Sequence, residues 1–363
     1  MIARIYTMID YKFIQTSDND FQRKLQERVN DYFARNEIVR KADKSMFWKT
    51  FFAFGFYALV YVVILFGSIS NLGVYFFLWA LLGLGHTFIG ICVMHDKVHG
   101  AYTNNKFVSF LLEIPILLIG VESKIWSIEH NIIHHNYTNV NGIDQDINPR
   151  FFFRFSKDQP IRWFHRFQHV YATFLYGLLT IEWITLKDFN KVRKFYSLGF
   201  LKTGWEAAFL TLQILIKKLV FFAVFLIIPL LVLPFPNYLI LLMFLTMVVV
   251  SGIVMTIIFQ LAHVVPNVEF ADVDRDKQVN WHLHQMRTTS NFAMNNKVLT
   301  FFLGGLNFQI EHHLFPDVCH VHYQSLSKIV QNTAREFDYP YHSNSTFLVA
   351  IRKHYSLLKE LGK

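Results

Sequence analysis

The sequence of 363 residues predicts an all-α integral membrane protein, with four transmembrane helices in two hairpins and a helical cap on the cytoplasmic side. Hydrophobic residues make up 53% of the chain and aromatic residues 17%, which is too apolar for an ordinary soluble domain. Residues 50–95 and 219–268 contain no Asp, Glu, Lys or Arg. At about 20 residues per crossing, each stretch is long enough for two helices joined by a tight turn.

The transmembrane helices are predicted near residues 47–68, 72–94, 215–233 and 238–260. The connecting turns are expected at residues 68–71 and 234–237. The membrane domain then covers residues 46–323. It follows a cytoplasmic segment, 1–45, and precedes a cytoplasmic helical segment, 324–363.

The charge pattern predicts the orientation of these helices. Neither turn contains a basic residue, whereas lysine or arginine flanks the opposite ends of the helices. Because basic residues collect on the cytoplasmic side, both termini are expected in the cytoplasm. The two cysteines cannot form a disulfide framework, which fits a reducing compartment.

Two further apolar segments, residues 107–120 and 171–186, are short for a crossing, and they contain Glu113 and Glu182. Such segments are typical of re-entrant or interfacial helices. We therefore predict that neither crosses the membrane.

Three histidine clusters lie just outside the predicted transmembrane helices. They are HDKVHG with His95 and His99, HNIIHH with His130, His134 and His135, and QIEHHLFP with Gln309, His312 and His313. On an α-helix, residues four apart share a face, so His130 and His134 form a pair, while His135 is turned about 100° away and can reach a second ion. The helix of the third cluster is expected to begin near Asn307 and to end before Pro316.

Seven histidines exceed the four ligands that saturate a structural zinc site, and zinc cannot change its oxidation state. Imidazole also binds iron and copper. Two metal ions with four or five ligands each account better for the number of clustered histidines. The cap is therefore predicted to hold a di-metal site. Its position at the mouth of a bilayer indicates redox chemistry on a lipid, and the alternative for these side chains is interfacial hydrogen bonding.

The other histidines lack this combination of spacing and position. His165 and His169 repeat the first spacing in an Arg-rich aromatic stretch, and we interpret them as unrelated to the site. His86 lies alone inside the second transmembrane helix and is predicted to be a packed, hydrogen-bonded residue. Four more lie near the clusters in sequence without their spacing: His282, His284, His320 and His322.

Polar residues after the second cluster are candidates for orienting a ligand. Asp144 and Asp146 can accept the second ring N–H of a ligating histidine. The alternative is a cap or a turn around Gly142, and Asn139 has the same two interpretations.

At this point the sequence resembles the membrane fatty acid desaturases, over residues 33–323. The family pattern is three histidine boxes, here with spacings of three, three and two residues. Gln309 replaces the first histidine of the third box, which resembles the front-end subgroup that desaturates between an existing double bond and the carboxyl end. The segments HNIIHHNYTN, FQLAHVV and GGLNFQIEHHLFP look most like bacterial acyl-CoA desaturases of the linoleoyl type.

The resemblance implies two iron ions held almost wholly by histidine, with dioxygen as co-substrate in the removal of two hydrogens from a fatty acyl chain. It also implies an eighth imidazole, His263, at the end of the fourth transmembrane helix. Gln309 is a weak candidate ligand, with a hydrogen-bonding or spacer role as the alternative. No catalytic residue beyond the metal ligands is expected.

The resemblance also implies partners. Many front-end enzymes contain a fused haem domain with a His-Pro-Gly-Gly loop, which is absent here. We therefore expect a separate electron donor, such as ferredoxin or cytochrome b5 with a reductase. The substrate is expected as an acyl-CoA or acyl-lipid in a bacterial inner membrane, and a net charge of +9 indicates contact with anionic lipid. No nucleic-acid motif is present.

Two alternatives remain open from the residues. A hydroxylase of the same superfamily, acting on an alkyl, sterol or carotenoid substrate, would need the same ligands. A histidine-rich metal transporter would place its polar ligands at mid-membrane, where here only His86 is expected.

Overall fold

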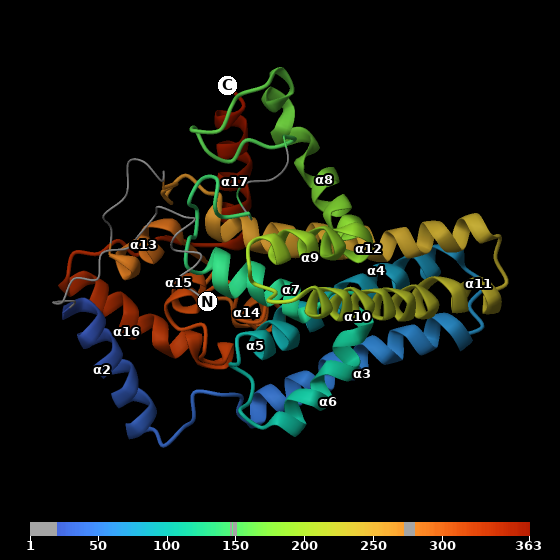
Figure 1. Ribbon diagram of the computed structural model, residues 1–363, viewed down its shortest axis with the longest axis horizontal. Helices are drawn as coiled ribbons and strands as arrows, with labels where there is room; N and C mark the ends of the chain where they lie inside the picture. The colour runs from blue at the N-terminus through green and yellow to red at the C-terminus, as the bar shows by residue number, and fades with distance from the viewer. Residues whose placement is uncertain (1–19, 146, 148–150, 272–279) are drawn as a thin grey trace.

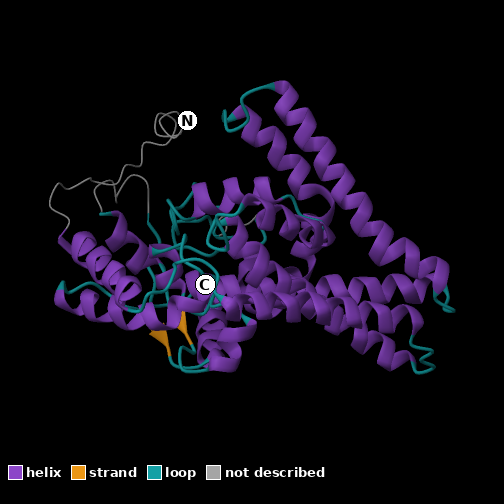
Figure 2. Ribbon diagram, turned by 90° about the horizontal axis from the view of Figure 1, so that it is seen from below, coloured by secondary structure: helices purple, strands orange, loops and turns teal. Residues whose placement is uncertain are grey.

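The structure is a computed structural model, and it describes residues 20–145, 147, 151–271 and 280–363. Long helices extend from one end of the molecule and meet a cap of shorter helices at the other (Figure 1). Two strands of two residues each are the only strands in these ranges (Figure 2). The predicted all-α fold class with four candidate transmembrane helices is confirmed.

The first hairpin consists of α3 (Lys44–Phe66) and a second span over Leu72–Val98. The second span contains α4 (Leu72–Phe88), a π-helical segment η1 (Ile89–Met94) and α5 (His95–Val98). The Asn71 side chain accepts hydrogen bonds from the N–H groups of Gly73 and Val74, which caps α4. The predicted turn thus ends at a capping residue.

The second hairpin consists of a span over Gly204–Val232 and of α12 (Asn237–His263). The first of these contains α10 (Gly204–Phe222), η6 (Ala223–Ile227) and α11 (Ile228–Val232). It begins at Gly204, not near residue 215, because Lys217 and Lys218 lie inside the helix. The two lysines are accommodated there because Lys217 Nζ lies 3.0 Å from a Glu122 carboxylate oxygen and Lys218 Nζ lies 2.9 Å from one of Asp188.

The two short apolar segments form helices that are not among the four candidate spans of the described residues. The first segment contains α6 (Lys106–Ile116) and the 3-10 turn η2 (Leu117–Ile119). The second lies within a longer helical stretch that contains α8 (Gln168–Glu182), the π-helical η5 (Trp183–Lys187) and α9 (Asp188–Ser197). Both segments lie against the spans, since η2 packs on α10 and α8 packs on α12.

The cap contains the segments that carry the second and third histidine clusters. The α2 helix packs on α16, and the strands β1 and β2 pair in parallel. Its elements are α2 (Asp20–Arg35), α7 (Ser123–Ser127), η3 (Ile128–His134), η4 (Trp163–Phe167), α13 (Trp281–Thr288), β1 (Asn291–Phe292), α14 (Lys297–Phe302), α15 (Gln309–Leu314), η7 (His320–His322), α16 (Tyr323–Glu336), β2 (Ser343–Asn344) and α17 (Phe347–Leu361).

Glycines allow α12 to approach α4 and α8 closely. A Cβ atom on Gly83 of α4 would lie 2.4 Å from the carbonyl oxygen of Met247 on α12. On the other side of α12, a Cβ atom on Gly252 would lie 2.7 Å from the carbonyl oxygen of Gly177 on α8. The α12 helix is therefore the central element of the fold, and it ends at His263.

Candidate metal centre

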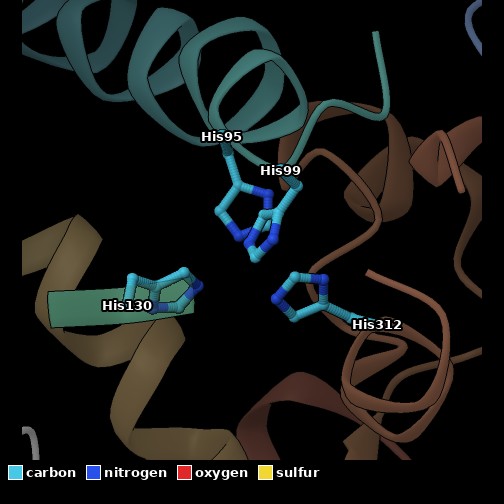
Figure 3. A group of neighbouring side chains, drawn as sticks. All are labelled: His95, His99, His130 and His312. Carbon is cyan, nitrogen blue, oxygen red and sulfur yellow. The ribbon is translucent and has the colours of Figure 1, made fainter. Parts of the chain in front are cut away.

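Eight histidines from distant parts of the chain come together at the cap end of the spans. In the first group the ring nitrogens lie within 4.8 Å of one another, and its members are His95, His99, His130 and His312 (Figure 3). A second group contains His134, His263 and His313, and His135 forms a third set with His312 and His313. All seven cluster histidines and His263 are thus brought together, with His135 between the two groups.

The second cluster lies on a π-helix, which changes the expected pairing. The N–H of His135 donates to the carbonyl oxygen of His130 at 2.9 Å, an i to i+5 bond. In place of the α-helical pair, the Nε2 atoms of His130 and His135 lie 3.3 Å apart, and His134 turns toward His263 and His313. His130 belongs to the first group and His134 to the second, although their rings still stack with centroids 5.1 Å apart, as the expected pair does.

The first cluster follows a π-helix as well, since His95 comes directly after η1. The rings of His95 and His99 lie 4.7 Å apart between centroids, and both belong to the first group. In the third cluster α15 begins at Gln309 and ends at Leu314, two residues before Pro316. Its adjacent histidines, His312 and His313, belong to the first and the second group respectively, and both also belong to the third set with His135.

The donor set fits metal ions. The Nε2 atoms of His99, His263 and His313 are buried and have no hydrogen-bond partner in the described ranges. Burial, with a smaller contribution from neighbouring imidazoles, holds the pKa values of five histidines well below the ordinary range: His99, His130, His135, His312 and His313. These rings are neutral at physiological pH, so each can present a nitrogen lone pair to a metal ion.

Hydrogen bonds to neighbouring residues orient several of the imidazole rings. The Nδ1 atom of His134 lies 3.1 Å from a carboxylate oxygen of Asp144, as the sequence predicted for one member of the Asp144 and Asp146 pair. The same oxygen accepts the N–H of Asn139 at 2.8 Å, so the turn interpretation of Asp144 holds too. Asp146 lies outside the described residues.

Asn139 has a structural position beside the site. Its φ angle is +56°, in the left-handed region that asparagine tolerates. Its side-chain amide donates to the carbonyl oxygen of His263 at 2.9 Å and to that of Glu269 at 3.1 Å. Asn139 therefore ties the second cluster to the end of α12.

Sequence reasoning missed Gln285 as a partner of the site. Its Oε1 atom accepts from Nδ1 of His313 and from the hydroxyl of Thr138, each at 2.9 Å, and its Nε2 atom donates to the carbonyl oxygen of His135, also at 2.9 Å. One buried amide thus aligns the second and third clusters. No spacing pattern in the sequence indicates this role.

Two aromatic residues that sequence reasoning missed also contact the rings. The hydroxyl of Tyr323 lies 3.2 Å from Nδ1 of His312. Trp126 stacks on His130 with ring centroids 4.3 Å apart and an interplanar angle of 18°. Both side chains restrict the orientation of a candidate ligand.

Gln309 is buried next to the second group and interacts with His263. Its Nε2 atom has no hydrogen-bond partner among the residues that the structure describes. An amide that faces the site in this way can ligate weakly through its oxygen or hold a bound group by a hydrogen bond.

Histidines outside the clusters have other partners. Nε2 of His165 contacts the carbonyl oxygen of Phe151 at 2.9 Å, and neither His165 nor His169 joins a group. Nε2 of His284 contacts the carbonyl oxygen of Thr138 at 2.8 Å, and His282 lies edge-on to Phe21. His322 packs against Phe33, and none of these five belongs to a group among the described residues.

His320 belongs to a separate buried cluster beside the first group. Its Nδ1 atom lies 2.7 Å from a carboxylate oxygen of Asp96, which also accepts from the Cys319 thiol at 3.0 Å. Lys49 places Nζ at 2.8 Å from the other ring nitrogen of His320. Burial first, and then the Asp96 charge, raises the pKa of the Cys319 thiol well above its ordinary range. Asp96, Cys319 and His320 therefore form a buried hydrogen-bonded cluster whose ligand atoms lie within 4.8 Å of one another, so these three residues could also hold a metal ion.

An apolar cavity reaches the first group. It is small, with a volume of about 20 Å³, and lies between α4 and η1, α12, η2 and the end of α8, where His95 and Trp126 are among its lining residues. Its other lining side chains are mainly aliphatic or aromatic. The histidine-rich end of the molecule therefore borders a small apolar pocket.

The comparisons with known proteins agree with this geometry. A family model described as fatty acid desaturase matches residues 70–345, which include all three histidine clusters. The chain belongs to the fatty acid desaturase family. It is therefore an oxidoreductase that desaturates fatty acyl chains, and the metal-transporter alternative is excluded.

Curated relatives of this desaturase match along most of its length. The sn-1 linoleoyl-lipid 6-desaturase of Arthrospira platensis is 32% identical over 349 residues, which cover 94% of this chain and 92% of that protein. A protein of the same name from Synechocystis is 31% identical, with 96% and 97% covered. The acyl-lipid (8-3)-desaturase of Physcomitrium patens is 32% identical, with 97% and 73% covered.

Proposed function

We propose that this desaturase introduces a double bond on the carboxyl side of an existing double bond, using a histidine-ligated di-iron centre and dioxygen. The observation that carries the proposal is the convergence of eight imidazoles, seven of them buried and that of His99 half-buried, beside an apolar pocket that His95 lines. Desaturation at an unactivated carbon needs a strong oxidant and a dry site next to the hydrocarbon chain. The apolar pocket supplies the dry site. The imidazoles supply ligands for the metal ions that would form the oxidant.

We assign the ligands by their grouping. The first iron would be held by His95, His99, His130 and His312, and the second by His134, His263 and His313. His135 lies between the groups, where its Nε2 atom is 3.0 Å from that of His312. When bound, the two irons supply the oxidising power that removes one hydrogen from each of two adjacent carbons.

The protein's own side chains position the reacting parts. Asp144 and Gln285 hold the rings of His134 and His313 in fixed orientations through Nδ1, which leaves Nε2 for the metal. The lining of the cavity keeps water away and holds the acyl chain beside His95. No side chain is needed as a general base.

The front-end assignment rests on Gln309 and on the relatives. Gln309 takes the place of the first histidine of the third box and faces the second group. The names of the Arthrospira and Synechocystis proteins describe a desaturase that acts on a linoleoyl lipid. We infer a polyunsaturated acyl substrate, such as a linoleoyl chain.

We further propose that both termini and the metal centre face the cytoplasm of a bacterial cell. The turns of both hairpins lie at the end of the molecule opposite the cap (Figure 1), and neither turn contains a basic residue. Electrons would come from a separate acidic carrier such as ferredoxin or cytochrome b5, since a net charge of +9 favours its encounter with the enzyme.

The substrate test is to supply stearate, oleate and linoleate separately to a host that expresses the enzyme, and to locate each new double bond by mass spectrometry. We expect a new bond on the carboxyl side of the existing bonds of linoleate. Efficient conversion of stearate to oleate, with linoleate unchanged, would refute the front-end assignment.

The metal test is the iron content of the purified enzyme, which we expect to be two ions per chain. Replacing His313 by Ala should lower the iron content and abolish product. His169→Ala is the matched control, because His169 lies outside every group of candidate ligands. Full activity of His313→Ala would contradict the ligand assignment.

A further inference from the structure

Glu311 is a buried carboxylate that has no part in the proposed function. It lies on α15 between Gln309 and His312. Residues two apart on an α-helix are turned by about 200° from each other, so its side chain projects from the side of α15 opposite to Gln309 and His313. Burying a carboxylate costs free energy unless hydrogen-bond donors satisfy its oxygens. The donors to Glu311 therefore identify what holds α15 in place.

Two side chains from other segments satisfy this carboxylate. The hydroxyl of Tyr341 donates to Oε1 of Glu311 at 2.8 Å, and the side-chain amide of Asn291 donates to Oε2, also at 2.8 Å. The same amide donates to the hydroxyl oxygen of Tyr341 at 2.9 Å, which closes a ring of hydrogen bonds. Neither partner is a cation, so directional hydrogen bonds and not ion pairs hold Glu311.

Asn291 on β1 connects this ring to the end of α12. Its Oδ1 atom accepts the N–H of Ile310 at 2.9 Å, so one buried side chain binds α15 at two neighbouring residues. The preceding residue, Ser290, donates its N–H to the carbonyl oxygen of Ala262 at 2.9 Å. Ala262 comes directly before His263. The strand therefore joins the last turn of α12 to α15.

This connection matters most for the second group of histidines. His263 ends α12 and His313 lies on α15, and their ring centroids are 4.9 Å apart. The second group has three members, so displacement of His313 leaves two. The α15 helix also carries His312, but the first group keeps three other members, which come from the first two clusters. A shift of α15 would therefore weaken the second group more than the first.

We propose that Asn291, Glu311 and Tyr341 are positioning residues that hold His313 against His263 and so give the second group its affinity for a metal ion. This inference rests on the proposed function, because it takes the second group as a metal site. Partners that orient ligands in this indirect way commonly change metal affinity by about 10- to 100-fold when they are replaced.

The test is the iron that the purified full-length enzyme retains during anaerobic titration with a ferrous chelator. The wild type should hold two ions per chain until the chelator is in excess. In Asn291→Ala and in Glu311→Ala we expect one ion to be lost at a chelator concentration about 10- to 100-fold lower, while the other is retained as in the wild type. This readout needs no turnover, and a general loss of structure would release both ions.

Two milder variants separate the hydrogen bonds from the charge. Glu311→Gln keeps an acceptor for the Asn291 amide and turns an N–H group toward the oxygen of Tyr341, so it should retain both ions. Early loss of one ion from Glu311→Gln, equal to that from Glu311→Ala, would assign the effect to the charge and overturn the positioning role. Tyr341→Phe removes only the hydroxyl, and it should release one ion early even if the alanine variants do not accumulate.

Tyr339→Phe is the matched control. It makes the same substitution two residues away, on a ring that stacks on Phe21 with centroids 4.4 Å apart, and it should retain iron as the wild type does. Wild-type retention of both ions by Asn291→Ala and Tyr341→Phe would overturn this inference, and so would simultaneous loss of both. A wild-type enzyme that holds fewer than two ions would instead refute the di-iron proposal, and this inference with it.

Discussion

At the scale of single residues, hydrogen bonds hold the imidazoles of His134 and His313 in one tautomer. A neutral histidine that donates from Nδ1 presents the lone pair of Nε2 to a metal ion. Asp144 does this for His134, and Gln285 does it for His313. Groups of this kind commonly change metal affinity or activity by about 10- to 100-fold when they are replaced.

We predict that Asp144→Asn lowers iron affinity by about 10- to 100-fold. The amide loses the negative charge beside His134, and it must also satisfy the N–H of Asn139. The measurement is iron retention during titration with a chelator, together with product formation. Asp31→Asn on α2 removes an exposed carboxylate that pairs with Arg35, and it should leave both quantities unchanged.

A second residue-scale prediction concerns pH and His354 on α17. Its Nδ1 atom contacts the carbonyl oxygen of Val264 at 2.8 Å, its Nε2 atom contacts the hydroxyl of Tyr176 at 2.9 Å, and burial lowers its pKa to about 4. Below an unfolded-state pKa of about 6.5 the unfolded chain binds the proton first, so the free energy of unfolding falls as the pH drops from about 6.5 to 4. The contribution is about 1.4 kcal/mol per pH unit in this window, and it is fully present above it.

The check is the free energy of unfolding in detergent, measured as a function of pH for the wild type and His354→Gln. Glutamine can keep both hydrogen bonds but does not titrate. Its profile should therefore be shallower than that of the wild type between about pH 4 and 6.5. Parallel profiles would show that His354 does not titrate in this way.

At the scale of elements, two features position the ligands: π-helical turns and close helix contacts. The π-helix η3 brings His135 to His130 and directs His134 to the other group. The contact of α12 with α4 and α8 places His263, the last residue of α12, beside His134, with ring centroids 4.8 Å apart. In both cases the conformation of the backbone and close helix contacts place the histidine side chains.

We predict that Gly252→Ala destabilises the enzyme by about 1–3 kcal/mol, the usual cost of overpacking. The added methyl group would meet the backbone oxygens of Gly177 and Tyr176 and the hydroxyl of Thr180, all closer than 3.0 Å. The α8 helix would have to move away from α12. The thermal unfolding midpoint in detergent measures the effect.

Gly55→Ala on α3 is the matched control, because no atom lies within 4 Å of its added methyl group. It should keep the midpoint or raise it, since alanine favours a helix over glycine. Equal midpoints for the wild type and Gly252→Ala would mean that α8 and α12 can separate without loss of stability.

At the scale of the whole molecule, the two hairpins bring the histidine groups to one end of the spans. Their turns share the opposite end, so a label can distinguish the two faces. The native cysteines, Cys92 and Cys319, are both buried, which gives a low background for thiol chemistry.

We predict that Ser70→Cys, in the turn of the first hairpin, reacts with a membrane-impermeant thiol reagent added outside intact cells. Asn104→Cys, in the exposed loop after the first histidine cluster, should react only after the membrane is broken. The opposite labelling pattern would reverse the proposed orientation and place the metal centre outside the cytoplasm.

The sequence predicted the number of spans, the two turns and the seven histidines of the clusters, because these depend on local composition and short spacings, whereas His263 was implied by the family resemblance. The long uncharged stretches require burial in lipid, and clustered histidines are identifiable wherever the chain folds. The start of α10 at Gly204 was not predictable from charge, since Lys217 and Lys218 are neutralised by acids that are distant in sequence.

Only the tertiary structure decided which imidazoles share a group. His263 and His313 are 50 residues apart, and their contact depends on how α12 packs against α4 and α8. His130 and His134 belong to different groups although their rings stack, and the π turn on which both lie is not predicted by an α-helical period. Gln285 likewise acquires its role from the side chains that surround it, because its hydrogen bonds join segments from several parts of the chain.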